Sequence, residues 1–81
     1  MDDVLRKVVS VADENGAARV SRVSVRLGAL SHFTPEHFRE HFRDAAMATL
    51  AEGAAVEAVV DGDLGSPGAT GVVIESVEVE A

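Results

Sequence analysis

The aromatic residues of this chain are confined to one short stretch. Phe33, Phe38 and Phe42 are all of them, and the 81 residues contain no Trp, Tyr or Cys. Most of the other apolar residues are Val and Ala. A chain of this length buries only about 60 % of the surface that its unfolded form exposes. The sequence therefore predicts a single light domain over residues 1–81, whose core gathers around the segment that carries the rings.

That segment is predicted to be a helix. Thr34 followed by Pro35 is a helix-start signal, with a hydroxyl cap and then a proline in the first helical position. We expect the helix to run from Pro35 to about Ala51 and to end at Gly53. Its buried stripe is expected to comprise Phe38, Phe42, Ala45 and Thr49, with Ala46 beside it.

The remaining segments complete an α+β pattern. Residues 2–15 have the apolar spacing of an amphipathic helix, whereas residues 19–28, 55–60 and 71–80 are predicted strands. Residues 61–70 are rich in glycine and are predicted to form a loop. We therefore predict a three-stranded sheet with two helices packed on one face, in the order α-β-α-β-β.

The charges are distributed unevenly. All seven basic residues lie in the first 43 positions, and the other 38 residues hold eight acids and no base. An acidic surface of this kind repels phosphates, so we expect neither nucleic acid nor an anionic membrane as a partner. We expect the charges to pair across the sheet, with Arg22 and Arg26 opposite Glu78 and Glu80. The expected inner side of the last strand comprises Val73, Val77 and Val79.

No feature of the sequence points to secretion or catalysis. The first residues, MDDVLRKVVSVADENG, lack a basic start and a long apolar run, so a cytoplasmic location is expected. The serines have no G-x-S-x-G context, and the glycines of residues 62–71 lack the Lys of a phosphate-binding loop. The sequence therefore predicts a protein that is not an enzyme.

All three histidines lie close to the predicted helix. His37 and His41 are four residues apart, so they lie on one side of the helix and could share a metal ion. At 100° per residue they lie about 120° and 80° from the centre of the apolar stripe. We expect them at the boundary or the surface, with a partner-contact patch and a metal site as alternatives. His32 is expected in the turn before the helix, beside Phe33.

Three stretches resemble the HypA/HybF family. They are, in order, VSVRLGALSHFTPEHFREHF (23–42), TLAEGAAVEA (49–58) and IESVEVE (74–80). The family comprises accessory proteins for nickel enzymes, mainly nickel–iron hydrogenases. The resemblance implies an α-β-α-β-β nickel-binding domain, interrupted by a zinc ribbon with two Cys-x-x-Cys pairs. It also implies a nickel site built on an N-terminal Met-His-Glu. The implied partners are a maturation GTPase and the large subunit of the enzyme.

The sequence departs from that pattern in two places. Loop 61–70, DGDLGSPGAT, stands where the family has its zinc ribbon, so no zinc is expected. The chain opens Met1-Asp2-Asp3 instead of Met-His-Glu. No position of this sequence therefore matches the nickel ligand that the resemblance implies. Asp2 and Asp3 are weak candidates for a cation, because carboxylates suit harder ions than nickel.

Three functional hypotheses follow. The first is a non-catalytic accessory protein that acts through protein contacts in the maturation or assembly of a nickel enzyme. The enzyme expected from the resemblance is a nickel–iron hydrogenase. The second is a HypA-derived scaffold or interaction subunit of a larger complex that no longer binds nickel. The third is a metal chaperone with a relocated site at His32, His37 and His41. No cofactor follows firmly from the residues, and nickel is the metal that the resemblance implies. The two free edges of a three-stranded sheet also allow a homo-oligomer.

Overall fold

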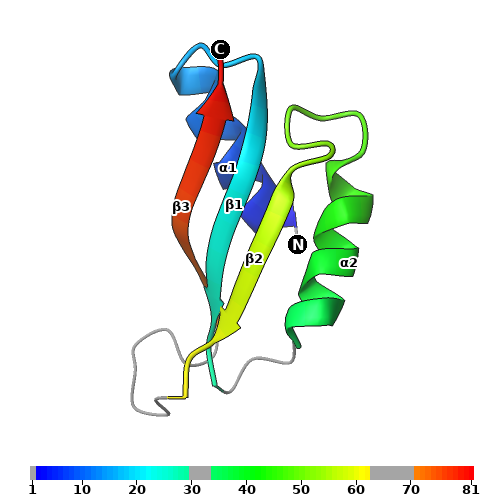
Figure 1. Ribbon diagram of the computed structural model, residues 1–81, viewed down its shortest axis with the longest axis vertical. Helices are drawn as coiled ribbons and strands as arrows, with labels where there is room; N and C mark the ends of the chain where they lie inside the picture. Colours follow the sequence, from blue (N-terminus) through cyan, green and yellow to red (C-terminus); the bar gives the residue numbers. More distant parts are fainter. Residues whose placement is uncertain (1, 30–33, 63–70) are drawn as a thin grey trace.

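The predicted layers are present in the computed structural model, which describes residues 2–29, 34–62 and 71–81. The elements are α1 (Asp2–Glu14), β1 (Arg19–Leu27), α2 (Pro35–Ala46), β2 (Ala55–Val60) and β3 (Val72–Glu80). Both helices lie on the same face of one three-stranded sheet (Figure 1). The predicted order and fold class are therefore confirmed. His32, Phe33 and most of loop 61–70 lie outside the described residues.

The sheet is organised around β1. The strand order is β2-β1-β3, with β2 parallel and β3 antiparallel to β1. The connection from β1 to β2 contains α2, which is the kind of crossover that a parallel pair requires. The side of β1 that faces the helices is buried and apolar. β2 and β3 are thus the outer strands of the described sheet.

The core gathers around α2, as the position of the aromatic residues predicts. Phe38 and Phe42 are 0 and 1 % exposed, and their ring centroids are 6.1 Å apart. From α1, Val8 and Ala12 are completely buried. The other buried apolar residues are Val20, Val23, Val25, Leu27, Ala46 and Ala51. Both helices and the central strand therefore contribute to one core together with the two rings.

The predicted end of α2 is wrong. The helix ends at Ala46, not near Ala51, and the next residues form turns. The Thr49 hydroxyl donates to the Ala46 carbonyl at 2.6 Å and accepts from the Ala51 amide at 3.1 Å. Ala48 has a φ of 65°. A threonine that bonds to nearby backbone in this way competes with helix continuation. Thr49 therefore belongs to the turn, and Ala46 rather than Ala45 completes the buried stripe.

A bulge changes which side chains of β3 face the core. Ser24 and Val25 are consecutive in β1, and they pair with Ser76 and Ile74 of β3. Glu75 is therefore an extra residue in β3. Val73 and Val77 therefore face opposite sides of the sheet, although strict alternation predicts one side for both. Val73 is 38 % exposed, whereas Val77 packs against the core. The prediction for Val73 was wrong for this reason.

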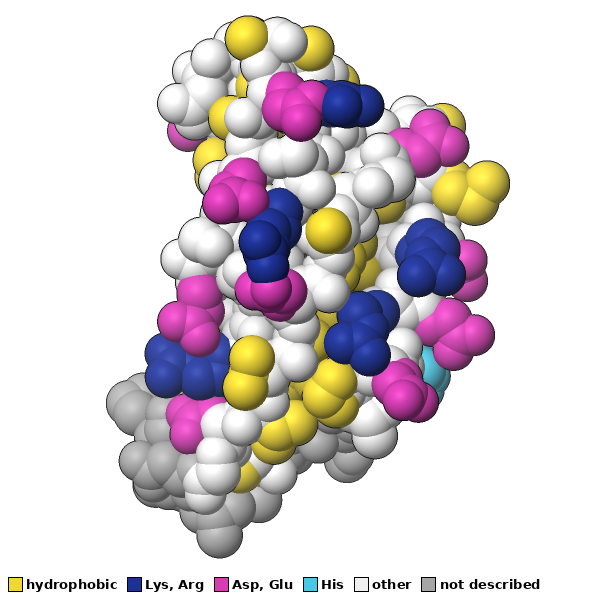
Figure 2. Space-filling view, in the orientation of Figure 1, with side chains coloured by type: hydrophobic (Ala, Val, Ile, Leu, Met, Phe, Trp, Pro, Cys, Tyr) yellow, Lys and Arg dark blue, Asp and Glu magenta, His cyan; other side chains and the backbone are white. Residues whose placement is uncertain are grey.

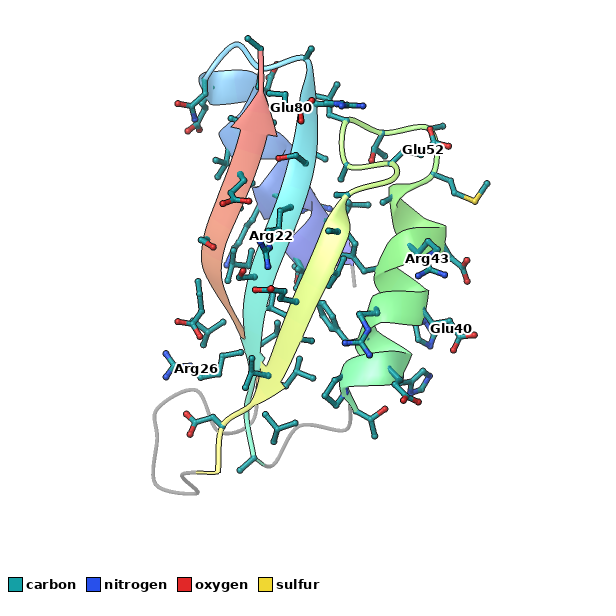
Figure 3. The ribbon with its side chains drawn as sticks, in the orientation of Figure 1. Arg22, Arg26, Glu40, Arg43, Glu52 and Glu80 are labelled. Carbon is teal, nitrogen blue, oxygen red and sulfur yellow. The ribbon has the colours of Figure 1, made fainter. Side chains whose placement is uncertain are left out.

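The uneven charges meet across the open face of the sheet (Figure 2). The ion pairs there join Arg19 to Glu80, Arg22 to Glu57, and Arg26 to Glu75 and Asp61. The first and last strands are neighbours, as expected, and Arg22 lies opposite Glu78 in the register. The guanidinium of Arg22, which is labelled in Figure 3, nevertheless pairs with Glu57 of β2, so the predicted partners were wrong. Each exposed pair of this kind contributes at most about 1 kcal/mol.

Neither helix of the described chain combines the length and the apolar character that crossing a membrane requires.

The central role of the rings predicts the effect of shortening one of them. We expect Phe42→Leu to lower the free energy of unfolding by about 1–2 kcal/mol, because a cavity replaces a buried ring. The matched control is Val59→Thr on the open face, where the side chain is 61 % exposed. The control should change stability by no more than about 0.5 kcal/mol. Urea denaturation followed by circular dichroism measures both, and equal effects would contradict this description of the core.

Candidate functional site

The first turn of α2 is held in place by its cap. Thr34 has extended backbone angles, and its hydroxyl accepts a hydrogen bond from the His37 amide at 3.2 Å. Pro35 follows as the first helical residue, where its lack of an N–H leaves no helical hydrogen bond unmade. The backbone that carries His37 is therefore fixed by local chemistry.

Two histidine rings lie side by side on the exposed surface of this helix. Their Nε2 atoms are 2.7 Å apart, and the centroids of the rings of His37 and His41 are separated by 4.4 Å. Both side chains are exposed. One imidazole donates its Nε2 proton to the Nε2 atom of the other, in a direction that depends on their tautomers. His32, the third histidine considered as a ligand, lies outside the described residues.

The acidic candidate that is described at the start of α1 is also exposed. The Asp3 side chain is 91 % exposed and forms an ion pair with the Arg6 guanidinium at 3.9 Å. The side chain of Asp2 is not among those described. Within the described residues, no group of three or more His, Cys, Asp or Glu side chains is arranged to hold a metal ion.

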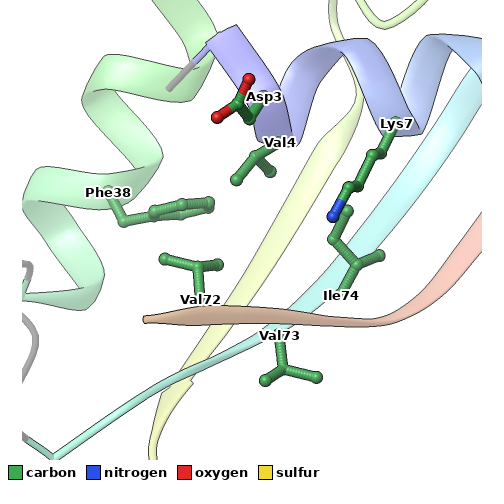
Figure 4. A pocket seen from close by; sticks show the side chains of 7 residues that line it. All are labelled: Asp3, Val4, Lys7, Phe38, Val72, Val73 and Ile74. Atoms are coloured by element: carbon green, nitrogen blue, oxygen red, sulfur yellow. The ribbon is translucent and has the colours of Figure 1, made fainter. Parts of the chain in front are cut away.

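Asp3 lies at the rim of a hollow between α1, α2 and the start of β3 (Figure 4). The hollow has a volume of about 510 Å³ and is lined by Asp3, Val4, Lys7, Phe38, Val72, Val73 and Ile74. Its lining is mostly apolar, with one carboxylate and one amine. These groups supply neither a nucleophile with a base nor a set of metal ligands. No local sequence pattern predicts this hollow, because its lining comes from three separate elements.

The chain resembles curated hydrogenase maturation factors in sequence. It is 43 % identical over 56 residues to hydrogenase maturation factor HypA 1 of Bradyrhizobium diazoefficiens, covering 69 % of this chain and 50 % of that protein. It is 38 % identical over 58 residues to hydrogenase maturation factor HypA of Archaeoglobus fulgidus, covering 72 % of this chain and 53 % of that protein. The chain thus spans about half the length of the curated relatives that it matches. No protein-family model matches the sequence.

The fold agrees with a solved structure of the same type. The nickel metallochaperone HypA from Helicobacter pylori, determined in solution, superposes with a TM-score of 0.79 at 16 % identity, covering 99 % of this chain and 93 % of that one. At that identity the match speaks for the fold. Together with the curated relatives, it confirms the resemblance seen in the three sequence stretches: the chain is HypA-like. The names of these proteins describe maturation factors and a chaperone, which agrees with the prediction that the chain is not an enzyme.

The exposed positions of the histidines predict that they contribute little to folding. We expect His37→Ala and His41→Ala each to change the free energy of unfolding by no more than about 0.5 kcal/mol. Alanine is also the better helix former, which offsets part of any lost contact. Thermal and urea denaturation of the two variants, beside Phe42→Leu, measures this. A loss as large as that of the phenylalanine variant would show that the rings are part of the core.

Proposed function

We propose that this chain is a non-catalytic accessory protein in the maturation or assembly of a nickel enzyme, a nickel–iron hydrogenase, and that it acts through protein contacts. The observation that carries this proposal is the 43 % identity over 56 residues to a hydrogenase maturation factor. The HypA-like fold of the described chain supports it. The proposed partners are the large subunit of the enzyme and a maturation GTPase, with nickel as the cargo and the cytoplasm as the location.

The connection between β2 and β3 supports a HypA-derived domain that has lost its ribbon. The two strands flank β1, and the described residues at both ends of their connection are hydrogen-bonded to the end of β1. The Asp61 amide donates to the Leu27 carbonyl, and the Gly28 amide donates to the Gly71 carbonyl, both at 2.8 Å. An insertion between Asp61 and Gly71 can therefore be gained or lost without disturbing the strands. We propose that loop 61–70 occupies the place of the family's zinc ribbon and that residues 1–81 form one domain.

A second function is favoured by the N-terminal sequence. The chain has Asp2 and Asp3 where the resemblance implies a histidine and a glutamate. Asp3 is almost fully exposed. Among the described residues, it belongs to no group of three or more His, Cys, Asp or Glu side chains that could hold a metal ion. A HypA-derived scaffold or interaction subunit of a larger complex that no longer binds nickel agrees with this difference.

Co-purification distinguishes these functions. We expect the chain, carrying a C-terminal affinity tag without histidines and expressed at its native level, to retain a nickel-enzyme large subunit or a maturation GTPase. Mass spectrometry of the eluate measures this, and an unrelated small protein with the same tag is the control. Retention of subunits from one stable complex without any maturation protein would favour the scaffold. Finding no nickel-enzyme component would contradict both functions.

A further inference from the structure

We propose that His37 and His41 form a two-nitrogen chelating site for a divalent ion of the nickel, copper and zinc group on the exposed side of α2. The site is separate from the N-terminal position to which the resemblance assigns nickel. The proposal does not depend on the proposed function, since the chain can bind such an ion whether or not it assists a nickel enzyme.

The spacing of the two donor atoms is close to what a shared ion needs. The Nε2 atoms of His37 and His41 are 2.7 Å apart. Bonds of about 2.05 Å from nitrogen to metal place two ligands about 2.9 Å apart at a right angle and about 3.3 Å apart at a tetrahedral angle. The rings therefore have to separate by only a few tenths of an ångström. For the ion to enter, the imidazole that donates its Nε2 proton changes to the Nδ1–H tautomer by proton exchange with solvent, so that both Nε2 lone pairs face the ion.

The surrounding helix holds the pair in position before any ion arrives. Each histidine is followed directly by a phenylalanine of the core, and Phe38 and Phe42 are almost completely buried. Thr34 caps the turn that carries His37. Because the backbone is fixed on both sides, binding has to order little besides the two rings. Preorganisation of this kind raises affinity by lowering the entropy cost of binding.

The type of donor determines which ions fit. Neutral imidazole suits zinc, copper and nickel, whereas magnesium and calcium prefer oxygen ligands. Glu40 and Asp44 follow the two histidines by three residues and lie on the same side of the helix, where they add negative potential. Arg39 and Arg43 lie about 180° and 140° around the helix from the midpoint of the pair. The local charges therefore favour a cation at this position.

Two protein ligands leave the coordination sphere open. Among the described residues, no third His, Cys, Asp or Glu joins the pair, so this part of the chain supplies two ligands to the ion. An incomplete sphere gives lower affinity than a closed structural site, and it leaves positions at which a second molecule can take hold of the ion. Such a site is suited to exchange rather than to storage.

Metal titration of the full, tag-free chain tests the proposal. We expect calorimetry and equilibrium dialysis with Ni²⁺, Cu²⁺ and Zn²⁺ to show one site tighter than about 100 μM for at least one ion, and no site for Mg²⁺. His37→Ala and His41→Ala should each weaken binding by about tenfold or more, since one donor cannot chelate. Circular dichroism and thermal unfolding without metal confirm that each variant folds.

Variants with matched composition separate the pair from other donors. The double variant H41A/R39H keeps three histidines but places the second ring on another side of the helix, so binding should remain weak. H41A/E40H restores a pair three residues apart and should recover part of the affinity. H32A and D2N/D3N should bind as the parent chain does. NMR line broadening by Cu²⁺ should centre on α2.

Several outcomes would overturn the proposal. The first is that the parent chain shows no site tighter than about 100 μM for any of the three ions. The second is that binding survives in the double variant H37A/H41A, or is lost in H32A or D2N/D3N instead, which would place the ligands elsewhere. None of these results bears on the co-purification experiment, so the two proposals can fail independently.

Discussion

The burial of Phe38 and Phe42 between the sheet and α1 is the contact on which the rest of the structure depends. All other buried side chains among the described residues are Val, Ala or Leu, and none of these approaches the area of an aromatic ring. α2 lies against β2 and approaches α1, and its two rings belong to the same buried cluster as the apolar residues of β1. The two rings therefore fix where α2 lies, and α2 in turn determines how β2 joins the sheet parallel to β1.

The polar face of the sheet follows from a different constraint. The basic residues of β1 lie between two outer strands that supply the acids, so the central strand is the positive element in an otherwise negative sheet. These pairs are exposed and weak one by one. Together these pairs favour the observed register of β3 against β1. A shift of β3 by one residue would bring its acidic side chains to the core side. The bulge at Glu75 shows that the register is set residue by residue.

Much of this fold follows from local sequence patterns. The strand at residues 55–60 and the capped start at Thr34 and Pro35 were predicted to the residue, because alternation and capping act within a few positions. The end of α2 was not, because the hydrogen bonds of Thr49 compete with a helix that propensity alone would continue. The exposure of Val73 was also missed. A bulge reverses which residues of a strand face the core, and no local pattern in the sequence indicates where the bulge lies. The spacing of His37 and His41 placed them on one helix side, but the 2.7 Å approach of their nitrogens depends on rotamers that no sequence pattern specifies.

The alternation of roles along α2 has a further consequence for evolution of the site. Positions 37 and 41 face outward while positions 38 and 42 support the core, so we expect substitution of the histidines to change stability little. Donor atoms at the N-terminus can change with the same freedom, because Asp3 has almost no contacts to lose. The nitrogen and carboxylate groups at these exposed positions are thus separate from the buried side chains that supply stability. Substitutions at either exposed position leave the buried rings of α2 in place.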